Sequence, residues 1–398
     1  MMDICRKGGS GLRFKKTVIL AVAALLGLMV GWTLPARAAF NIDARAAILM
    51  DPVSGRVLFA QDEHQRLPPA SVTKVMTMLL ILEDIHSGRA HWNDPITTSA
   101  VAATMGGSQV YLKEGETFPL KELFKTVAVV SANDSSAAIA EHLYGSVQDF
   151  VEAMNEKARE LGLKNTHFAN ETGLPDPGHY SSAYDLAVIS RELVQYPEIF
   201  EFTSIWLDKF RDGQFMLRNT NELIQVYRGC DGLKTGHTDE AKFCLSATAK
   251  RGDFRLLSVV LGAETNAKRL AESRRLLDYG YRNFQWKTIK ESKGTAGQVS
   301  ISAAQKQLVP VKLKGDLGTV VERGKDQLIE TRIAVDPKLK LPVAAGGRIG
   351  TMTATLNGKT VARAPVYAVE RVEQANFLTR LWRGLRDFFT GLFRKSAR

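Results

Sequence analysis

The sequence has few cysteines and lacks the common metal-binding and phosphate-binding motifs. Three cysteines occur in 398 residues, and only Cys230 and Cys244 follow the N-terminal segment. Two cysteines do not make a disulfide framework, so one bridge and two buried thiols are both open. The seven histidines are scattered and no His-Glu-x-x-His occurs, so we expect no metal and no other cofactor. No phosphate-binding glycine loop, internal repeat or low-complexity tract is visible.

Positive charge is concentrated at the two ends of the chain, although the whole chain has a net charge of +11. Residues 1–38 contain six basic residues and one acidic residue, and residues 374–398 have the same balance. The remaining body therefore carries only +1. This distribution excludes a basic nucleic-acid-binding body, and we expect no nucleic-acid partner.

Residues 1–38 have the pattern of a secretory signal peptide. Basic residues precede an apolar run over 17–34, and Ala36 and Ala38 form a small-x-small site, so we expect cleavage after Ala38. An uncleaved anchor is the alternative, because 18 residues are close to a spanning length. Cys5 precedes the apolar run, which argues against a lipoprotein. We expect an exported protein.

Residues 39–285 are predicted to form one α+β domain. Strands are expected over 46–50, 57–60, 230–236, 243–249 and 256–261, and helices over 71–85, 119–145, 147–162, 183–195 and 265–280. Strands at both ends with helices between them predict a sheet that joins the start and the end of the domain. The helix that starts at Ser71 has apolar residues on nearly every face, so we expect it to be buried.

Residues 286–373 are predicted to form a small all-β domain. They contain short alternating stretches, and Asn357-Gly358 is a strong hairpin signal. The domain contains no cluster of chemically reactive residues, and a spacer or docking role fits it.

Residues 374–398 are predicted to form an amphipathic helix. At 100° per residue, nine large apolar side chains between Phe377 and Phe393 share one face, and the arginines Arg380, Arg383, Arg386 and Arg394 share the other. This pattern is typical of a helix lying in a membrane surface, and we assign that role to residues 376–395. The alternative is a helix that docks on its own protein.

Ser71-Val72-Thr73-Lys74 is the one Ser-x-x-Lys motif in the chain. Residues i and i+3 share a helix face, so the Ser71 hydroxyl and the Lys74 amine can meet. A serine needs an adjacent base to become a nucleophile, and a partly buried lysine with a lowered pKa can serve. On its own the motif is weak, because an ordinary serine-capped helix has the same pattern.

Two further motifs follow at 60 and 103 residues. Ser131-Ala132-Asn133 lies between helical runs, where the serine can relay a proton and the amide can hold a peptide group. Lys234-Thr235-Gly236 lies on a strand, where the lysine and threonine can hold a carboxylate and the glycine permits close approach. Each motif has a structural alternative, a helix cap or a strand end, but their order, spacing and settings together are a strong signal.

With these three motifs the chain resembles a low-molecular-mass penicillin-binding protein, a serine-type D-alanyl-D-alanine carboxypeptidase. The resemblance extends over the chain after the signal and includes 67–74, 106–109, 131–134, 231–238, the β domain and the tail. It implies a penicillin-binding/β-lactamase-like transpeptidase fold, a peptidoglycan stem peptide as substrate and β-lactams as covalent inhibitors. The implied roles are nucleophile (Ser71), base (Lys74), proton relay (Ser131), substrate positioning (Asn133), carboxylate binding (Lys234, Thr235), close approach (Gly236) and oxyanion binding by backbone N–H groups (Ser71, His237).

Departures from the family pattern leave alternatives open. Some relatives have an arginine where Thr220 stands, and Arg218 is a candidate substitute. A β-lactamase would need a deacylating glutamate; Glu171 is in that region, but Pro175 stands where an asparagine is expected. A DD-endopeptidase and a catalytically idle membrane-bound binder are further alternatives. The expected location is the periplasmic face of the inner membrane.

Overall fold

The computed structural model describes residues 40–324, 328–377 and 379. The predicted signal peptide and most of the predicted amphipathic helix therefore lie outside the described residues. Within the described part, no helix is both long enough and apolar enough to cross a bilayer.

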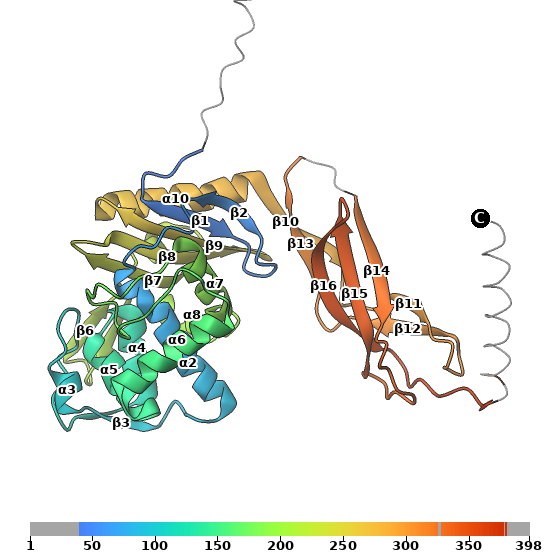
Figure 1. The fold of residues 1–398 in the computed structure, drawn as a ribbon, viewed down its shortest axis with the longest axis horizontal. Coiled ribbons are helices and arrows are strands. Elements are labelled where there is room, and N and C mark those ends of the chain that lie inside the picture. Colours follow the sequence, from blue (N-terminus) through green and yellow to red (C-terminus); the bar gives the residue numbers. More distant parts are fainter. Residues whose placement is uncertain (1–39, 325–327, 378, 380–398) are drawn as a thin grey trace, which may run out of the picture. The chain divides into compact units, whose positions relative to one another are not determined.

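A five-stranded antiparallel sheet organises the first region (Figure 1). Its strand order is β2-β1-β9-β8-β7. The strands are β1 (Ala46–Met50), β2 (Val57–Gln61), β7 (Cys230–Thr238), β8 (Lys242–Arg251) and β9 (Phe254–Ala263). Ala46 pairs with Leu261, so the sheet joins the two ends of this region, as the sequence predicted. The strand β7 lies last in the order, which leaves one of its edges without a neighbouring strand.

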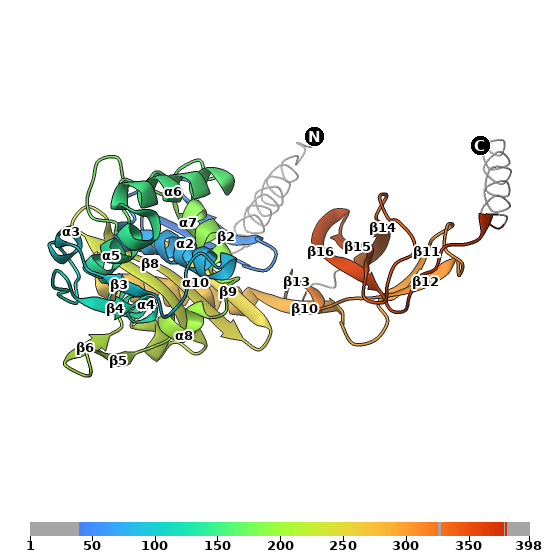
Figure 2. The ribbon, with the colours of Figure 1, turned by 90° about the horizontal axis from the view of Figure 1, so that it is seen from below.

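Helices cover both faces of this sheet. The helices of this region are α2 (Lys74–Ser87), α3 (Ala100–Ala103), α4 (Leu120–Val129), α5 (Asn133–Tyr144), α6 (Val147–Glu160), α7 (Ala183–Leu193), α8 (Ile199–Thr203), α9 (Leu223–Val226) and α10 (Asn266–Asn283). The helix α10 contacts β8 and β9 from one side, and α7 contacts the same strands from the other, where α2, α4, α5 and α6 also gather (Figures 1 and 2). Coverage on both faces explains why β9 is apolar and buried along most of its length. Two small hairpins, β3 (Pro95–Thr97) with β4 (Thr117–Pro119) and β5 (Leu207–Phe210) with β6 (Phe215–Arg218), complete the region.

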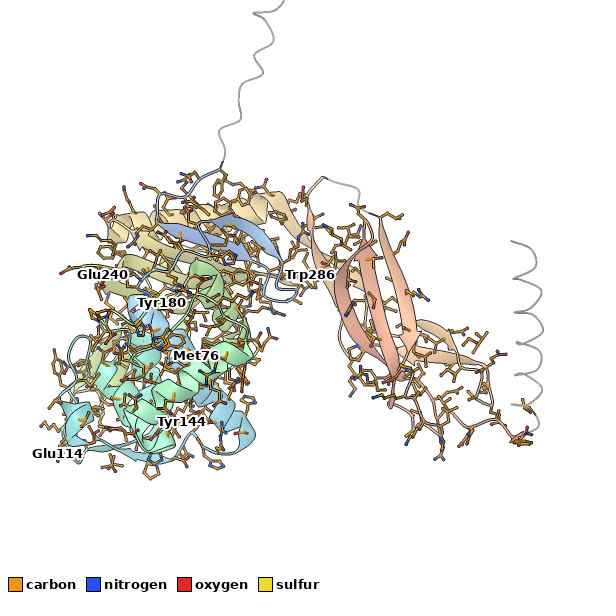
Figure 3. The ribbon with its side chains drawn as sticks, in the orientation of Figure 1. Met76, Glu114, Tyr144, Tyr180, Glu240 and Trp286 are labelled. Carbon is orange, nitrogen blue, oxygen red and sulfur yellow. The ribbon has the colours of Figure 1, made fainter. Side chains whose placement is uncertain are left out.

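The helix α2 is buried as predicted, but it begins later than expected. Residues Ala70–Thr73 form a 3-10 turn, η1, and the α-helix starts at Lys74. Ten of its side chains are buried, including Met76, which lies in the interior (Figure 3). Gly88 ends the helix in the left-handed conformation, with φ of 79°.

Residues from 284 onward form a second set of strands with its own core. The sheet order is β11-β12-β16-β15-β14, and a separate pair joins β10 to β13. The strands are β10 (Phe284–Lys290), β11 (Gly297–Ser300), β12 (Leu308–Lys312), β13 (Leu317–Glu322), β14 (Ile329–Val335), β15 (Arg348–Leu356) and β16 (Lys359–Ala368). Asn357 and Gly358 both have positive φ, which fits the predicted two-residue hairpin. The strand β10 crosses residue 286, where the sequence suggested a boundary, and neither β10 nor β13 was predicted.

The two cysteines on neighbouring strands are free. Cys230 lies opposite Ala249, whereas Cys244 lies opposite Gly236, so their positions along the strand pair are far apart. Burial raises the pKa of the Cys230 thiol to about 12 and that of Cys244 to about 11. Of the two possibilities left open by the sequence, the structure has unpaired thiols, of which Cys244 is buried and Cys230 is partly buried.

Candidate active site

Ser71 lies in the 3-10 turn that precedes α2. The Val72 N–H donates to the Pro69 carbonyl at 3.2 Å and closes the turn. Ala70 is held at φ of 48°, a left-handed conformation that strains a residue with a side chain and is common at functional sites. The first residue of α2, Lys74, places its Nζ 3.2 Å from the Ser71 Oγ. The contact predicted from the i, i+3 spacing is therefore present.

The Lys74 amine is fully enclosed and has three acceptors. Besides Ser71, it donates to the Asn133 Oδ1 at 2.6 Å and to the Thr172 carbonyl at 2.8 Å. Its side chain is 0% exposed and is among the largest fully buried side chains in the described residues. Three acceptors fix the direction of the amine, so its position relative to the Ser71 hydroxyl is set by the fold.

Burial lowers the pKa of Lys74 to about 7, against the opposing charges of Glu171 and Asp134. An ammonium in a dry site loses its hydration, and the neutral amine is then favoured. Near pH 7 a large share of the molecules has a neutral amine beside Ser71. Such an amine can accept the hydroxyl proton when Ser71 attacks a carbonyl carbon.

A loop over residues 170–179 packs directly against the turn that holds Ser71. The Asn170 Oδ1 accepts three backbone N–H groups, including that of Gly173 at 2.7 Å, and folds the loop. Gly173 has φ of 84°, and a Cβ there would lie 1.9 Å from the Ala70 carbonyl oxygen. Glu171 is buried, its Oε1 has no hydrogen-bond partner among the described residues, and burial raises its pKa.

Ser131 lies in the turn between α4 and α5, so its motif lies between helices as predicted, whereas the helix predicted over 119–145 is interrupted here. Its φ is 67°, and its buried Oγ has no hydrogen-bond partner in the described part of the chain. Asn133, at the start of α5, donates from its backbone to the Ser108 carbonyl at 2.7 Å and from its Nδ2 to the Gly106 carbonyl at 2.6 Å. The amide of Asn133 thus ties the 106–108 loop to Lys74. Because the Ser131 hydroxyl has no hydrogen-bond partner among the described residues, it is available to relay a proton.

Lys234 and Thr235 lie on the edge strand β7 with little exposure. Burial lowers the pKa of Lys234 well below its ordinary value, and the positive charges of Lys74 and Arg269 lower it further. The Thr235 hydroxyl donates to the hydroxyl of Thr220 at 2.6 Å. Lys74, Lys234 and Arg269 therefore face one region, where a bound anion would favour the protonated forms of the two lysines.

Gly236 allows β7 to approach the turn that contains Ser71. A Cβ at this residue would lie 2.7 Å from the Pro69 carbonyl and 3.0 Å from the Ser71 nitrogen. The next residue, His237, is exposed, and its ring stacks on Phe243 with 4.1 Å between centroids. The glycine therefore permits the backbone of β7 to lie directly against the turn that contains Ser71.

A pocket of about 400 Å³ brings most of these residues together. It is lined by Ser71, Ser108, Ser131, Thr220, Glu222, Thr235, Gly236, His237, Phe243, Asn266 and Arg269. Of the predicted site residues, Lys74, Asn133 and Lys234 are buried and are absent from this lining. Lys74 and Asn133 still belong to the site, because hydrogen bonds connect them to each other and to Ser71.

The arginine that lines this pocket is Arg269, and the suggestion that Arg218 substitutes at Thr220 stays an untested prediction. The guanidinium of Arg218 lies over the Trp206 ring at 5.1 Å and does not line the pocket. Arg269 is 7% exposed, its buried Nε has no partner among the described residues, and burial lowers its pKa. The sequence held one signal for it: Asn266 and Arg269 stand three residues apart just after Thr265, which caps α10.

The arrangement suits acyl transfer to a serine. A hydroxyl next to a neutral buried amine supplies the nucleophile, and a second hydroxyl can protonate the leaving group. The Arg269 guanidinium favours a substrate with a carboxylate. In residues 40–324, 328–377 and 379, no three His, Cys, Asp or Glu side chains gather as a metal site would require.

Comparison with known proteins agrees with this geometry. Residues 33–265 match the D-alanyl-D-alanine carboxypeptidase family, and residues 284–374 match the C-terminal domain of penicillin-binding protein 5. The D-alanyl-D-alanine carboxypeptidase DacF of Bacillus subtilis is 39% identical over 350 residues, which are 87% of this chain and 90% of the relative. The crystal structure of penicillin-binding protein 5 from Haemophilus influenzae has a TM-score of 0.71 at 33% identity, and the match covers 84% of this chain and 99% of that one. Penicillin-binding protein D2 of Listeria monocytogenes, solved with ampicillin bound, has a TM-score of 0.56 at 31% identity and covers 62% of this chain and 100% of its own.

The chain therefore belongs to the D-alanyl-D-alanine carboxypeptidase family of penicillin-binding serine peptidases. It is a hydrolase with a transpeptidase-like domain followed by an all-β domain, as the sequence indicated.

Proposed function

We propose that this enzyme removes the terminal D-alanine of peptidoglycan pentapeptides through an acyl-enzyme on Ser71. The observation that carries the assignment is the 3.2 Å contact between the Ser71 Oγ and the Lys74 Nζ, with the pKa of Lys74 lowered to about 7. In the first step Lys74 accepts the hydroxyl proton while the Ser71 oxygen attacks the carbonyl of the penultimate D-alanine. Water later attacks the ester, releases the shortened peptide and restores the serine.

The negative oxygen of the tetrahedral intermediate needs donors that are in place before the reaction. We assign this role to the backbone N–H groups of Ser71 and His237. The close packing at Gly236, where a Cβ would lie only 3.0 Å from the Ser71 nitrogen, supports this pairing. The unoccupied hydroxyl of Ser131 then passes a proton to the leaving nitrogen, so that D-alanine departs as a neutral amine.

The terminal carboxylate of the substrate is assigned to Thr235, Lys234 and Arg269. The Nε of Arg269 is buried without a partner among the described residues, and a buried donor of this kind is stabilised when a ligand supplies the acceptor. The bond between Thr235 and Thr220 holds the threonine hydroxyl in the pocket. Asn133 contributes by holding Lys74 and the 106–108 loop, which positions the walls against which the peptide lies.

β-Lactams are expected to acylate the same serine and to leave slowly. Fast release would require a carboxylate that activates water at the ester. Glu171 is 1% exposed and does not line the pocket, which favours a penicillin-binding peptidase over a β-lactamase.

Replacing Ser71 by alanine tests the assignment. D-Alanine release from a muramyl pentapeptide, followed by mass spectrometry, and labelling by a fluorescent penicillin should both disappear. Wild-type release of D-alanine by the variant would refute the proposal. A variant with Ser54 replaced by alanine is a suitable control, because Ser54 belongs to a surface turn beside Asp51 and should leave both readouts intact.

We also propose that the enzyme acts at the periplasmic face of the inner membrane. A signal over 1–38 would export the chain, residues 39–285 would form the peptidase domain, 286–373 the β domain and 374–398 the membrane-binding segment. The nine apolar residues and the arginines of residues 376–395 support a helix that lies in the bilayer surface. A chain truncated after residue 373 should keep its catalytic rate and move to the soluble fraction; retention on membranes would contradict the anchor.

A further inference from the structure

The carbonyl group of Ala70 is held by a side chain from its own turn. The Thr73 hydroxyl donates to the Ala70 carbonyl oxygen at 2.8 Å. This carbonyl belongs to the planar peptide group that links Ala70 to Ser71, so the Ser71 N–H lies in the same plane and points in the opposite direction. That N–H is one of the two donors that we assign to the oxyanion. The hydrogen bond from Thr73 therefore restricts how the peptide plane can turn.

A histidine from the loop over residues 170–179 supports the Thr73 hydroxyl. The His179 Nε2 lies 2.7 Å from the Thr73 Oγ1, and the Ala169 N–H donates to the His179 Nδ1 at 3.1 Å. Burial lowers the pKa of His179 to about 4, so the ring is neutral at pH 7. Since the Nδ1 of this neutral ring is an acceptor, its one proton is on Nε2, which donates to the threonine. The backbone of the loop thus sets the tautomer of the histidine.

These hydrogen bonds form a chain that runs in one direction. It begins at the Ala169 N–H, which donates to His179. The ring donates to the Thr73 hydroxyl, and this hydroxyl donates to the Ala70 carbonyl. Hydrogen bonds in series polarise one another, and a carbonyl that accepts a hydrogen bond makes the N–H of its own peptide group a stronger donor. The last donor of this chain is the Ser71 N–H.

The surroundings of the Ala70 carbonyl distinguish this contact from an ordinary helix bond. Threonine hydroxyls often bond to a carbonyl of their own helix. Here the carbonyl belongs to a residue with φ of 48°, a conformation that persists only where its surroundings hold it. Thr73 is 0% exposed and His179 is 4% exposed, so water does not compete for these bonds. A Cβ at Gly173 would lie 1.9 Å from the Ala70 oxygen and 2.8 Å from the Thr73 Oγ1, so the loop packs directly on both atoms.

We propose that Thr73 and His179 are positioning residues for the oxyanion hole, an inference that rests on the proposed function of Ser71. They do not touch the substrate. They hold the peptide group between Ala70 and Ser71 so that its N–H points to the place where the negative oxygen develops. The full negative charge exists only in the tetrahedral intermediate and near it in the transition states. Their contribution should therefore appear in kcat and not in KM.

Thr73→Val removes the hydroxyl and keeps the shape of the side chain. For D-alanine release we expect kcat to fall about tenfold, less than the 10²–10³ lost with a whole oxyanion donor, and KM to stay within about twofold. A peptide boronic acid forms a tetrahedral adduct with Ser71 that places an oxygen in the oxyanion position, so its affinity should fall by the same factor as kcat. Thr73→Ser keeps the hydroxyl and should retain kcat within about threefold.

His179 offers a second pair of variants, which keeps the test decisive if Thr73→Val does not fold. His179→Gln retains an acceptor for the Ala169 N–H and a donor for Thr73, whereas His179→Leu has neither. His179→Leu should lower kcat and boronic-acid affinity together, and His179→Gln should restore most of both. The double variant Thr73→Val with His179→Leu should have the kcat of Thr73→Val, because the histidine acts through the hydroxyl. Equal losses in the Gln and Leu variants would contradict the role of the ring.

Thr126→Val is the matched control. The Thr126 hydroxyl is also buried, donates to the Leu123 carbonyl three residues before it at 2.7 Å and contacts the Ser135 Oγ at 2.7 Å. It does not line the pocket. Because both threonines lose the same kind of hydrogen bond, both variants should lower the melting temperature, but only Thr73→Val should lower kcat. An equal fall in kcat in Thr126→Val would overturn the inference.

The outcomes separate this inference from the proposed function. If the wild-type enzyme releases D-alanine and a folded Thr73→Val keeps the wild-type kcat, or loses activity through KM alone, the positioning role is refuted and the assignment of Ser71 stands. The same holds if boronic-acid affinity is unchanged in Thr73→Val. If the wild-type enzyme neither releases D-alanine nor is labelled by penicillin, the proposed function is wrong and the positioning role fails with it.

Discussion

Replacing Lys74 by arginine keeps a positive side chain but removes the neutral amine on which the proposed reaction depends. Arginine has a pKa above about 12 and cannot act as a base in a protein. The pKa of Lys74 is about 7 instead of 10.5. Near pH 7 about half of the molecules therefore have a neutral amine, whereas an unshifted lysine would be neutral in about one molecule in 3,000.

These fractions set the expected pH dependence. The wild-type kcat/KM for D-alanine release should rise with pH, with a slope of one below pH 7, and should level off above it. The sign follows from the chemistry, since the base form of Lys74 appears as its proton is lost. Lys74→Arg should lower kcat/KM by at least about 10³, because a general base contributes 10²–10⁴ and the larger guanidinium also disturbs the three hydrogen bonds of the amine.

Two assays check this prediction: D-alanine release and the rate of acylation by a fluorescent penicillin, each measured from pH 5 to 9. Lys125→Arg is a matched control, because Lys125 forms ion pairs with Glu122 and Asp208 away from the pocket. Circular dichroism would show whether Lys74→Arg is folded. A flat pH profile of the wild type, or more than a tenth of the activity in a folded Lys74→Arg, would refute the role of Lys74.

Three contacts around the site lead to further predictions. Glu171→Gln removes a negative charge that raises the pKa of Lys74, so the rising limb of the kcat/KM profile should move to lower pH; a move to higher pH would contradict the coupling. Arg269→Gln should raise KM about tenfold or more for peptides with a free terminal carboxylate, and much less for peptides whose terminus is amidated. Equal effects on both kinds of peptide would exclude carboxylate binding by Arg269. Gly173→Ala adds a Cβ 1.9 Å from the Ala70 carbonyl oxygen, so it should lower the free energy of unfolding. The loss should be about 1–3 kcal/mol larger than for the control Gly88→Ala, since Gly88 has the same left-handed φ but a Cβ there would have no neighbour within 4 Å. Equal denaturation midpoints for the two variants would contradict the clash.

The catalytic motifs were predictable because each depends on short-range geometry. The i, i+3 spacing of Ser71 and Lys74 required only a helical turn, and the prediction survived although that turn is a 3-10 helix instead of the start of α2. The centre of the sheet was predictable for a related reason, since β1 and β9 are largely continuous apolar and buried runs.

The missed parts depend on contacts between distant segments. Arg269 enters the pocket because α10 packs on β8 and β9, which no local pattern reveals, and Arg218 was the nearer candidate in sequence. The buried position of Glu171 likewise comes from the packing of its loop on the 3-10 turn. The strands β10 and β13, which pair with each other in a separate two-stranded sheet, were also missed.

The three buried basic groups around the pocket, Lys74, Lys234 and Arg269, also have a consequence for the stability of the empty enzyme. Lys74 and Arg269 each lower the pKa of Lys234, so the free protein holds groups that disfavour one another's charge. An anion that occupies the pocket reduces this unfavourable interaction and so increases the free energy of unfolding. A ligand at 100 times its Kd adds about 2.7 kcal/mol to the free energy of unfolding. The melting temperature of this protein should therefore report on pocket occupancy, even for anions that are never cleaved.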